Sequence, residues 1–175
     1  VAHESDTEVA QAREELAAGN AAGAIVLLDK ALEADPDNPR TLLALAEAQA
    51  AAGDAVAAEA TLDSLPVDEQ ANPEVVNLRN HLFFEGQLAG APDATELEAR
   101  LAADPDDAEA LLQLALHKVV AKNYVAAMDL LLQLMQKDRS YGDDAGRRGL
   151  LKVFELLGDN PKVSEYRRRM ATLLH

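Results

Sequence analysis

Apolar residues return every three or four positions along almost the whole chain, the spacing of a helix that buries one face. Leu and Ala fill most of these positions. Short polar segments separate the apolar stretches and contain turn-forming pairs such as Gly19-Asn20 and Gly53-Asp54. This pattern predicts an all-α protein of about ten short helices, joined in pairs as five helical hairpins.

The turn signals recur with a period of about 34 residues. Asn38-Pro39 and Asn72-Pro73 lie 34 residues apart, and Asn160-Pro161 repeats the signal near the end. Each pair suits the start of a helix, because Asn caps the free backbone N–H groups and Pro is tolerated at the first helical position. We therefore predict a single domain over residues 1–175, with repeat units near 5–38, 39–73, 74–107 and 108–142 and a C-terminal hairpin at 143–175.

Small residues, among them Ala12 and Ala46, occupy positions where the two helices of a unit must approach closely. With Pro36 and Pro105 near the ends of their units, this arrangement resembles the tetratricopeptide repeat (TPR) family. The resemblance implies an α-solenoid whose groove binds other proteins. The family's Trp is absent and Arg100 stands at a small-residue position, so the third unit departs most from the family pattern.

Composition and charge narrow the classes of partner. Aromatic residues make up 3% of the chain and Cys is absent, so disulfides and thiolate metal sites within it are excluded. The net charge of −15 argues against nucleic acid as a partner, although residues 137–175 hold 9 Lys and Arg against 6 Asp and Glu. Neither a long apolar run nor a signal-peptide pattern occurs, so no membrane association is expected.

The sequence offers no arrangement of residues for catalysis or metal binding. Its four histidines, His3, His81, His117 and His175, are scattered singly, and the Asp-rich turns at 35–38 and 104–107 do not continue into a calcium loop. Glycine-rich phosphate loops and a nucleophile elbow are also missing. We predict a protein that is not an enzyme and that carries no cofactor and no metal.

The TPR resemblance implies that the first helix of each unit lines the partner-binding groove. The candidate groove residues are Val9, Arg13, Leu43, Glu47, Leu78, Leu82, Leu112 and Leu116, and the same repeat register places Arg79 on the groove face. The Lys and Asn clamp with which some TPR proteins hold the C-terminal carboxylate of heat-shock chaperones is absent. A largely apolar groove suits an amphipathic helix or an extended apolar segment. The same leucines equally fit a core between repeats, and periodicity does not separate the two readings.

The C-terminal segment carries a narrower resemblance. It contains Tyr141-Gly142-Asp143-Asp144, Arg147-Arg148-Gly149-Leu150-Leu151 and Tyr166-Arg167-Arg168-Arg169-Met170, and it resembles the end of the chaperedoxin family (YbbN type). The resemblance implies a bacterial, cytoplasmic stress-response protein that holds unfolding clients and passes them to general chaperones, including the chaperonin. It also implies a thioredoxin-like domain before Val1, which the lack of Cys and of an initial Met fits.

The family resemblance assigns chaperone docking to the last helix, from about Pro161 to His175. Its candidate residues are Tyr166, Arg167, Arg168, Met170, Leu173 and Leu174. Several of them fall on one helical stripe, which is also what a capping helix at the end of a solenoid requires. Docking and capping can coexist.

The leading hypothesis is therefore a protein–protein interaction module of a thioredoxin-linked, cytoplasmic chaperone or co-chaperone. The sequence leaves its oligomeric state open, and a monomer is favoured. It would bind unfolding clients and dock on general chaperones. The alternative is a TPR scaffold that assembles a fixed multiprotein complex without holding clients.

Overall fold

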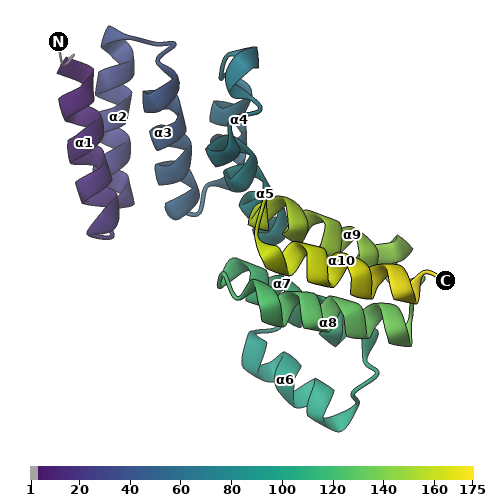
Figure 1. Cartoon of the computed structure of the whole chain (residues 1–175). Coiled ribbons are helices and arrows are strands. Elements are labelled where there is room, and N and C mark those ends of the chain that lie inside the picture. The colour runs from purple at the N-terminus through teal and green to yellow at the C-terminus, as the bar shows by residue number, and fades with distance from the viewer. Residues whose placement is uncertain (1–3) are drawn as a thin grey trace. The chain divides into compact units, whose positions relative to one another are not determined.

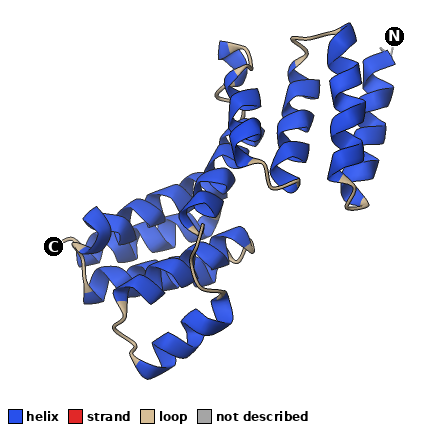
Figure 2. Cartoon of the chain, turned by 180° about the vertical axis from the view of Figure 1, so that it is seen from behind, coloured by secondary structure: helices blue, strands red, loops and turns tan. Residues whose placement is uncertain are grey.

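The computed structural model describes residues 4–175, and all regular secondary structure in that part of the chain is helical (Figure 2). The prediction of an all-α fold of ten helices is confirmed over these residues. The α-helices are α1 (Glu4–Ala17), α2 (Ala21–Ala34), α3 (Pro39–Ala51), α4 (Ala55–Asp63), α5 (Pro73–Gln87), α6 (Ala94–Ala103), α7 (Ala108–Val120), α8 (Tyr124–Lys137), α9 (Tyr141–Leu157) and α10 (Pro161–Leu173). A 3₁₀ turn, Val67–Glu69, precedes α5.

Most helices begin at an Asn or Asp whose side chain accepts a hydrogen bond from a backbone N–H of the first turn. Asn38 caps α3 and Asn160 caps α10, each with Pro at the first helical position. Asn72 likewise accepts from the N–H of Glu74 at the start of α5. These side chains satisfy N–H groups that a helix leaves without internal partners, which is why the Asn-Pro pairs marked helix starts in the sequence.

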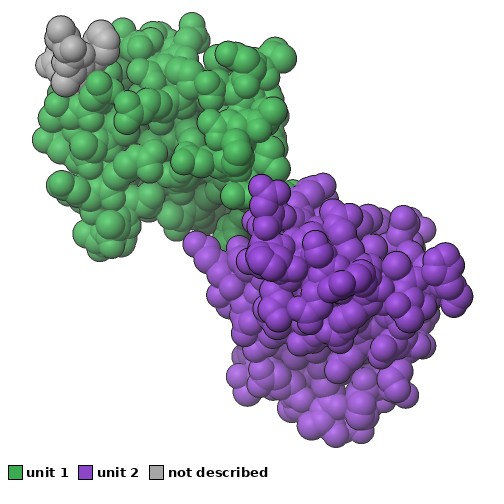
Figure 3. Space-filling view, in the orientation of Figure 1, with its two compact units in different colours: residues 1–82 green, residues 83–175 purple. Residues whose placement is uncertain are grey.

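The helices form two compact units, residues 1–82 and residues 83–175 (Figure 3). A single domain was the expectation from the sequence. The boundary lies within α5, where the apolar contacts change: Leu82 belongs to the core around Leu62, and Phe84 belongs to the core around Leu131.

In unit 1, residues 1–82, helices α1, α2 and α3 pack side by side (Figure 1). Val9 of α1 and Leu28 of α2 share a core with Leu45 of α3, and the neighbouring core joins α3 and α4 to the start of α5. Alanines stand at the close contacts, as the sequence predicts: Ala12 and Ala46 are fully buried. A larger side chain at these positions would separate helices that pack at about 8–10 Å.

Unit 2, residues 83–175, is built around α7, α8, α9 and α10, which lie together in Figures 1 and 2. Its core contains Met128, Leu131 and Met135 of α8 with Leu150 and Val153 of α9. Gly146 and Gly149 let α9 approach α8. A Cβ atom on Gly146 would lie 2.9 Å from Met135 Cγ and 3.2 Å from the Leu131 carbonyl oxygen.

Substitution of these glycines tests the close packing of α9. Gly146→Ala is expected to lower the free energy of unfolding by about 1–3 kcal/mol, because the added methyl overpacks the contact with α8. Urea denaturation followed by circular dichroism measures the change. Gly86→Ala is the matched control: beyond the backbone of its own helix and its chain neighbours, nothing lies within 4 Å of a Cβ there, so a helical alanine should stabilise the chain by up to about 1 kcal/mol. Equal effects of the two substitutions would contradict the packing argument.

Candidate partner-binding grooves

An apolar groove of about 410 Å³ lies on unit 2. Helices α5, α7 and α9 supply its walls. The lining residues are Phe83, Phe84, Gln87, Leu112, Leu116, Ala145, Arg148, Gly149, Leu151, Lys152 and Glu155. Arg148, Leu151, Lys152 and Glu155 stand at positions i, i+3, i+4 and i+7, so one face of α9 forms a whole side of the groove.

Phe83 gives the groove an exposed aromatic surface. Its side chain is 43% exposed, whereas its neighbour Phe84 is buried in the core. The two rings meet edge to face, with centroids 5.5 Å apart and an interplanar angle of 78°. Lys152 Nζ lies 5.5 Å from the centroid of the Phe83 ring. Phe83 is thus held in position beside apolar lining residues, an arrangement typical of surfaces that bind apolar groups.

Arg148, at the edge of this groove, is fixed by an unusual backbone turn. Gly142, Asp143 and Asp144 at the start of α9 all have left-handed backbone angles, with φ of 59°, 57° and 63°. Arg148 Nε donates to the Asp143 carbonyl oxygen at 2.8 Å, and Nη2 donates to the Gly142 carbonyl oxygen at 2.7 Å. Left-handed conformations are unfavourable for residues other than Gly, so these bonds compensate for local strain.

A second groove, of about 800 Å³, lies on unit 1 and is polar. Charged residues of both signs line it together with the buried apolar residues Leu43, Leu65 and Val75. The charged lining residues are Arg13, Asp35, Asp37, Arg40, Glu69 and Glu74. Four carboxylates against two guanidinium groups make this groove acidic.

Glu47 lies beside the unit 1 groove, and its surroundings disfavour the charged form of its carboxyl group. Arg13 Nη1 lies 3.4 Å from Glu47 Oε2. Burial raises the pKa of Glu47, and the charge of Glu74 raises it further, while Arg13 partly opposes the shift. The pKa of Glu47 is therefore raised despite the ion pair, because desolvation outweighs the attraction to Arg13.

The groove residues predicted from the sequence are distributed over both units. Arg13 and Leu43 line the unit 1 groove, and Leu112 and Leu116 line the unit 2 groove. Burial divides them further: Val9, Leu43, Leu82 and Leu116 are buried, Leu78, Leu112 and Glu47 are half-buried, and Arg13 is exposed. Val9 and Leu82 belong to the core of unit 1, so packing accounts for these positions.

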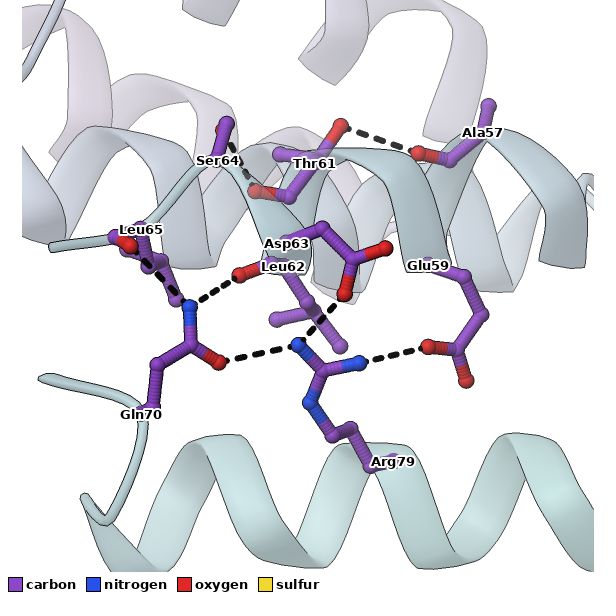
Figure 4. A network of polar contacts seen from close by, with 9 residues as sticks. All are labelled: Ala57, Glu59, Thr61, Leu62, Asp63, Ser64, Leu65, Gln70 and Arg79. Atoms are coloured by element: carbon purple, nitrogen blue, oxygen red, sulfur yellow. Dashed lines mark hydrogen bonds and ion pairs between the residues drawn. The ribbon is translucent and has the colours of Figure 1, made fainter. Parts of the chain in front are cut away.

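Arg79, which the repeat register placed on the groove face, instead joins α5 to the end of α4 (Figure 4). Its guanidinium donates to Glu59 at 2.7 Å, and to Asp63 and the side-chain oxygen of Gln70 at 2.9 Å each. The Gln70 amide in turn donates to the carbonyl oxygens of Leu62 and Leu65, at 2.9 and 3.0 Å. These bonds satisfy carbonyl groups at the end of α4, so we assign Arg79 a structural role.

The predicted docking helix is α10, and the structure divides its candidate residues. Tyr166 and Met170 are buried in the core of unit 2, at 3% and 8% exposure. The Tyr166 hydroxyl lies 2.5 Å from Asp129 Oδ1, and burial raises the pKa of this hydroxyl. These two residues therefore anchor α10 to α8, and their burial leaves little side-chain surface for docking.

The other candidates on α10 keep an accessible surface. Leu173 and Leu174 are half-buried against the unit 2 core, and Arg167 and Arg168 are exposed. The Arg167 guanidinium lies 5.0 Å from the centroid of the Phe154 ring, a cation–π distance. Capping therefore accounts for one face of α10, and a basic face remains on the other.

Four residues that line the unit 2 groove were not among the residues predicted from the sequence: Phe83, Arg148, Leu151 and Lys152. One signal was present: with aromatic residues at only 3% of the chain, two adjacent Phe residues stand out. Helical periodicity places a residue on a face, but it does not tell whether a neighbouring helix covers that face.

Metal ligands do not cluster within residues 4–175: no three His, Asp or Glu side chains there are placed to hold an ion. His117 Nε2 lies 2.8 Å from the Pro92 carbonyl oxygen and so joins α7 to the loop before α6. His3 lies outside the described residues. None of the helices formed by residues 4–175 has the length and apolar character needed to cross a membrane.

The chain belongs to the tetratricopeptide repeat family: two family models for this repeat match it, one over residues 15–82 and one over residues 87–175. These two ranges follow the two units. Such repeats are typically non-catalytic modules for protein–protein interaction, which identifies the general role of the chain. No curated protein matches the chain significantly.

Three solved structures are similar to the chain at low sequence identity. A domain of unknown function from Vibrio parahaemolyticus is 24% identical, with 97% of this chain and 99% of that chain covered and a TM-score of 0.44. A thermophilic TPR protein of Thermus thermophilus is 19% identical, with 97% and 98% covered and a TM-score of 0.47. The protein MamA is also 19% identical, with 99% and 94% covered and a TM-score of 0.41.

The raised pKa of Glu47 predicts a pH-dependent effect of Glu47→Gln. A raised pKa in the folded state means that the parent chain loses stability as pH rises through that pKa, whereas Gln does not titrate. The free energy of unfolding of Glu47→Gln minus that of the parent chain should therefore be larger at pH 7 than at pH 4. Chemical denaturation at both pH values measures this change, with exposed Glu33→Gln as the control for loss of charge. A decrease over the same interval would contradict the assignment.

Proposed function

We propose that the chain is the protein-binding module of a thioredoxin-linked chaperone or co-chaperone of the bacterial cytoplasm. In this proposal the unit 2 groove binds apolar segments of unfolding clients, and α10 docks on a general chaperone such as the chaperonin. The proposal rests mainly on one observation, the exposed Phe83 ring beside the half-buried Leu112 and Leu151.

The chemistry of this groove suits unfolding clients. An unfolding protein exposes apolar side chains that differ from one client to the next, so a useful site offers apolar area with little directional demand. Phe83, Leu112 and Leu151 supply such area. Displacing water from these side chains provides a driving force that does not depend on one client sequence.

The polar groove of unit 1 supports a second candidate function. Its four carboxylates and two guanidinium groups favour a partner with a matching, fixed charge pattern, because charged groups contribute more to specificity than to affinity. A fixed partner is what a scaffold of a multiprotein complex requires. The two functions differ in whether unfolded proteins are bound at all.

Loss of the Phe83 ring tests the client-binding proposal. Phe83→Ala is expected to raise the amount of chain needed to suppress aggregation of a heat-unfolded model enzyme by about fivefold, the effect of losing one important aromatic contact. Light scattering during heating measures the suppression. Val125→Ala is the matched control, because Val125 also lies in unit 2, is 42% exposed and does not line the groove.

If the parent chain, Phe83→Ala and Val125→Ala all suppress aggregation equally well, the clients bind somewhere other than at Phe83. If the parent chain fails to suppress aggregation, the chaperone proposal is wrong and the scaffold becomes the better account. Circular dichroism of each variant verifies that its helices are intact.

The exposed basic face of α10 is tested without touching the core residues Tyr166 and Met170. Arg167→Gln combined with Arg168→Gln should weaken binding to a purified bacterial chaperonin at least fivefold, since two charges are lost from one face. Surface binding measurements give the affinity. Lys118→Gln combined with Lys137→Gln removes two charges from unit 2 outside α10 and should have little effect. Equal affinities of both double variants would remove docking from α10.

A further inference from the structure

Arg148 presents a positioned positive charge at the groove of unit 2. A guanidinium group has five N–H donors, and the two hydrogen bonds to the carbonyl oxygens of Gly142 and Asp143 use only two of them. Both acceptors are neutral, so these bonds orient the group without neutralising it. The side chain is exposed. The left-handed turn thus holds a cation in a defined place beside the apolar lining.

The charge of this groove is opposite to that of the chain. Its charged lining residues are Arg148, Lys152 and Glu155, and Lys152 lies 3.8 Å from Glu155. These three side chains leave an excess of one positive charge, whereas the whole chain carries −15. The groove of unit 1 instead has an excess of carboxylates. Of these two grooves, the one on unit 2 combines apolar lining residues with an excess of positive charge.

Given the proposed function, in which this groove takes up protein segments, we propose that its preferred ligand is an amphipathic helix with Glu or Asp beside the apolar face. The apolar residues would lie against Phe83 and Leu151, and a carboxylate would meet Arg148. Guanidinium and carboxylate groups form two parallel hydrogen bonds, which favours Arg over Lys for such a contact.

A helical ligand follows from the walls of the groove. Helices α5, α7 and α9 form them, and within residues 4–175 no strand offers an edge to which an extended segment could be added. A helix laid in a groove places apolar residues at every third or fourth position on one side. Charged residues one position away from that stripe then point to the edge, where Arg148 lies.

Three labelled peptides test the charge preference. They share Leu at positions spaced three and four residues apart and carry Glu, Gln or Lys at the flanking positions. Fluorescence anisotropy with the whole chain should give the tightest binding for the Glu peptide, about fivefold tighter than the Gln peptide at low salt. The preference should decline as salt is added. The net charge of the chain by itself predicts the reverse order, so the order is diagnostic.

Variants locate the contact. Arg148→Gln should abolish the preference for Glu over Gln, while Arg147→Gln, which removes the same charge from a neighbouring residue outside the groove, should preserve it. Arg148→Lys should keep part of the preference, because the charge remains and the planar fork is lost. Leu151→Gln should weaken all three peptides alike. Circular dichroism verifies folding of each variant.

The outcomes separate this inference from the proposed function. If the three peptides bind with equal affinity and Leu151→Gln weakens all of them, the preference for acidic peptides is wrong, but the groove remains a binding site. Binding in the order Lys, Gln, Glu also overturns it. No binding of any peptide, or no effect of Leu151→Gln, removes the groove itself from the account. If analytical ultracentrifugation shows that the parent chain is a dimer and that Leu151→Gln is a monomer, the groove is instead the contact with a second copy of the chain.

Discussion

The close approach of α9 to α8 is the contact on which the structure of unit 2 depends. Gly146 and Gly149 have no Cβ, and in that space Leu131 and Met135 of α8 come against the α9 backbone. One side of α9 is thereby committed to the core through Leu150 and Val153. Because a helix separates its faces by fixed angles, fixing this side also fixes the direction of Arg148, Leu151 and Lys152. The apolar groove is thus a consequence of how tightly the opposite face is packed.

The same division of faces explains α10. Tyr166 and Met170 attach this helix to α8, and the hydrogen bond between the Tyr166 hydroxyl and Asp129 satisfies the one polar atom of a buried aromatic side chain. Arg167 and Arg168 then remain on the outer face. A terminal helix of a solenoid needs a polar outer surface in any case, so the basic face serves solubility whether or not a chaperone docks there.

The helices could be predicted from the sequence because local chemistry marks their ends: Asn38, Asn72 and Asn160 cap helices as expected. The buried Ala12 and Ala46 likewise mark close contacts between helices. The boundary between the two units inside α5 could not be predicted. Leu82 and Phe84 are both apolar, and only the folded structure shows that they join different cores. Arg100, which stands at a small-residue position of the third unit, is half-buried and forms a two-pronged contact with Asp107, the residue that caps α7. The groove at Phe83 and Arg148 depends on tertiary packing and on the left-handed turn at the start of α9. In the sequence of that turn, only Gly142 is a residue type that favours left-handed backbone angles.

Hydrogen–deuterium exchange of the whole chain, with and without a saturating unfolded client, tests most directly whether unit 2 provides the binding surface. Backbone amides exchange more slowly where a bound segment restricts local opening. The account predicts slower exchange at the C-terminal end of α5, along α7 around Leu112 and along α9 from Ala145 to Glu155. Protection confined to residues 4–82, with these segments unchanged, would contradict it.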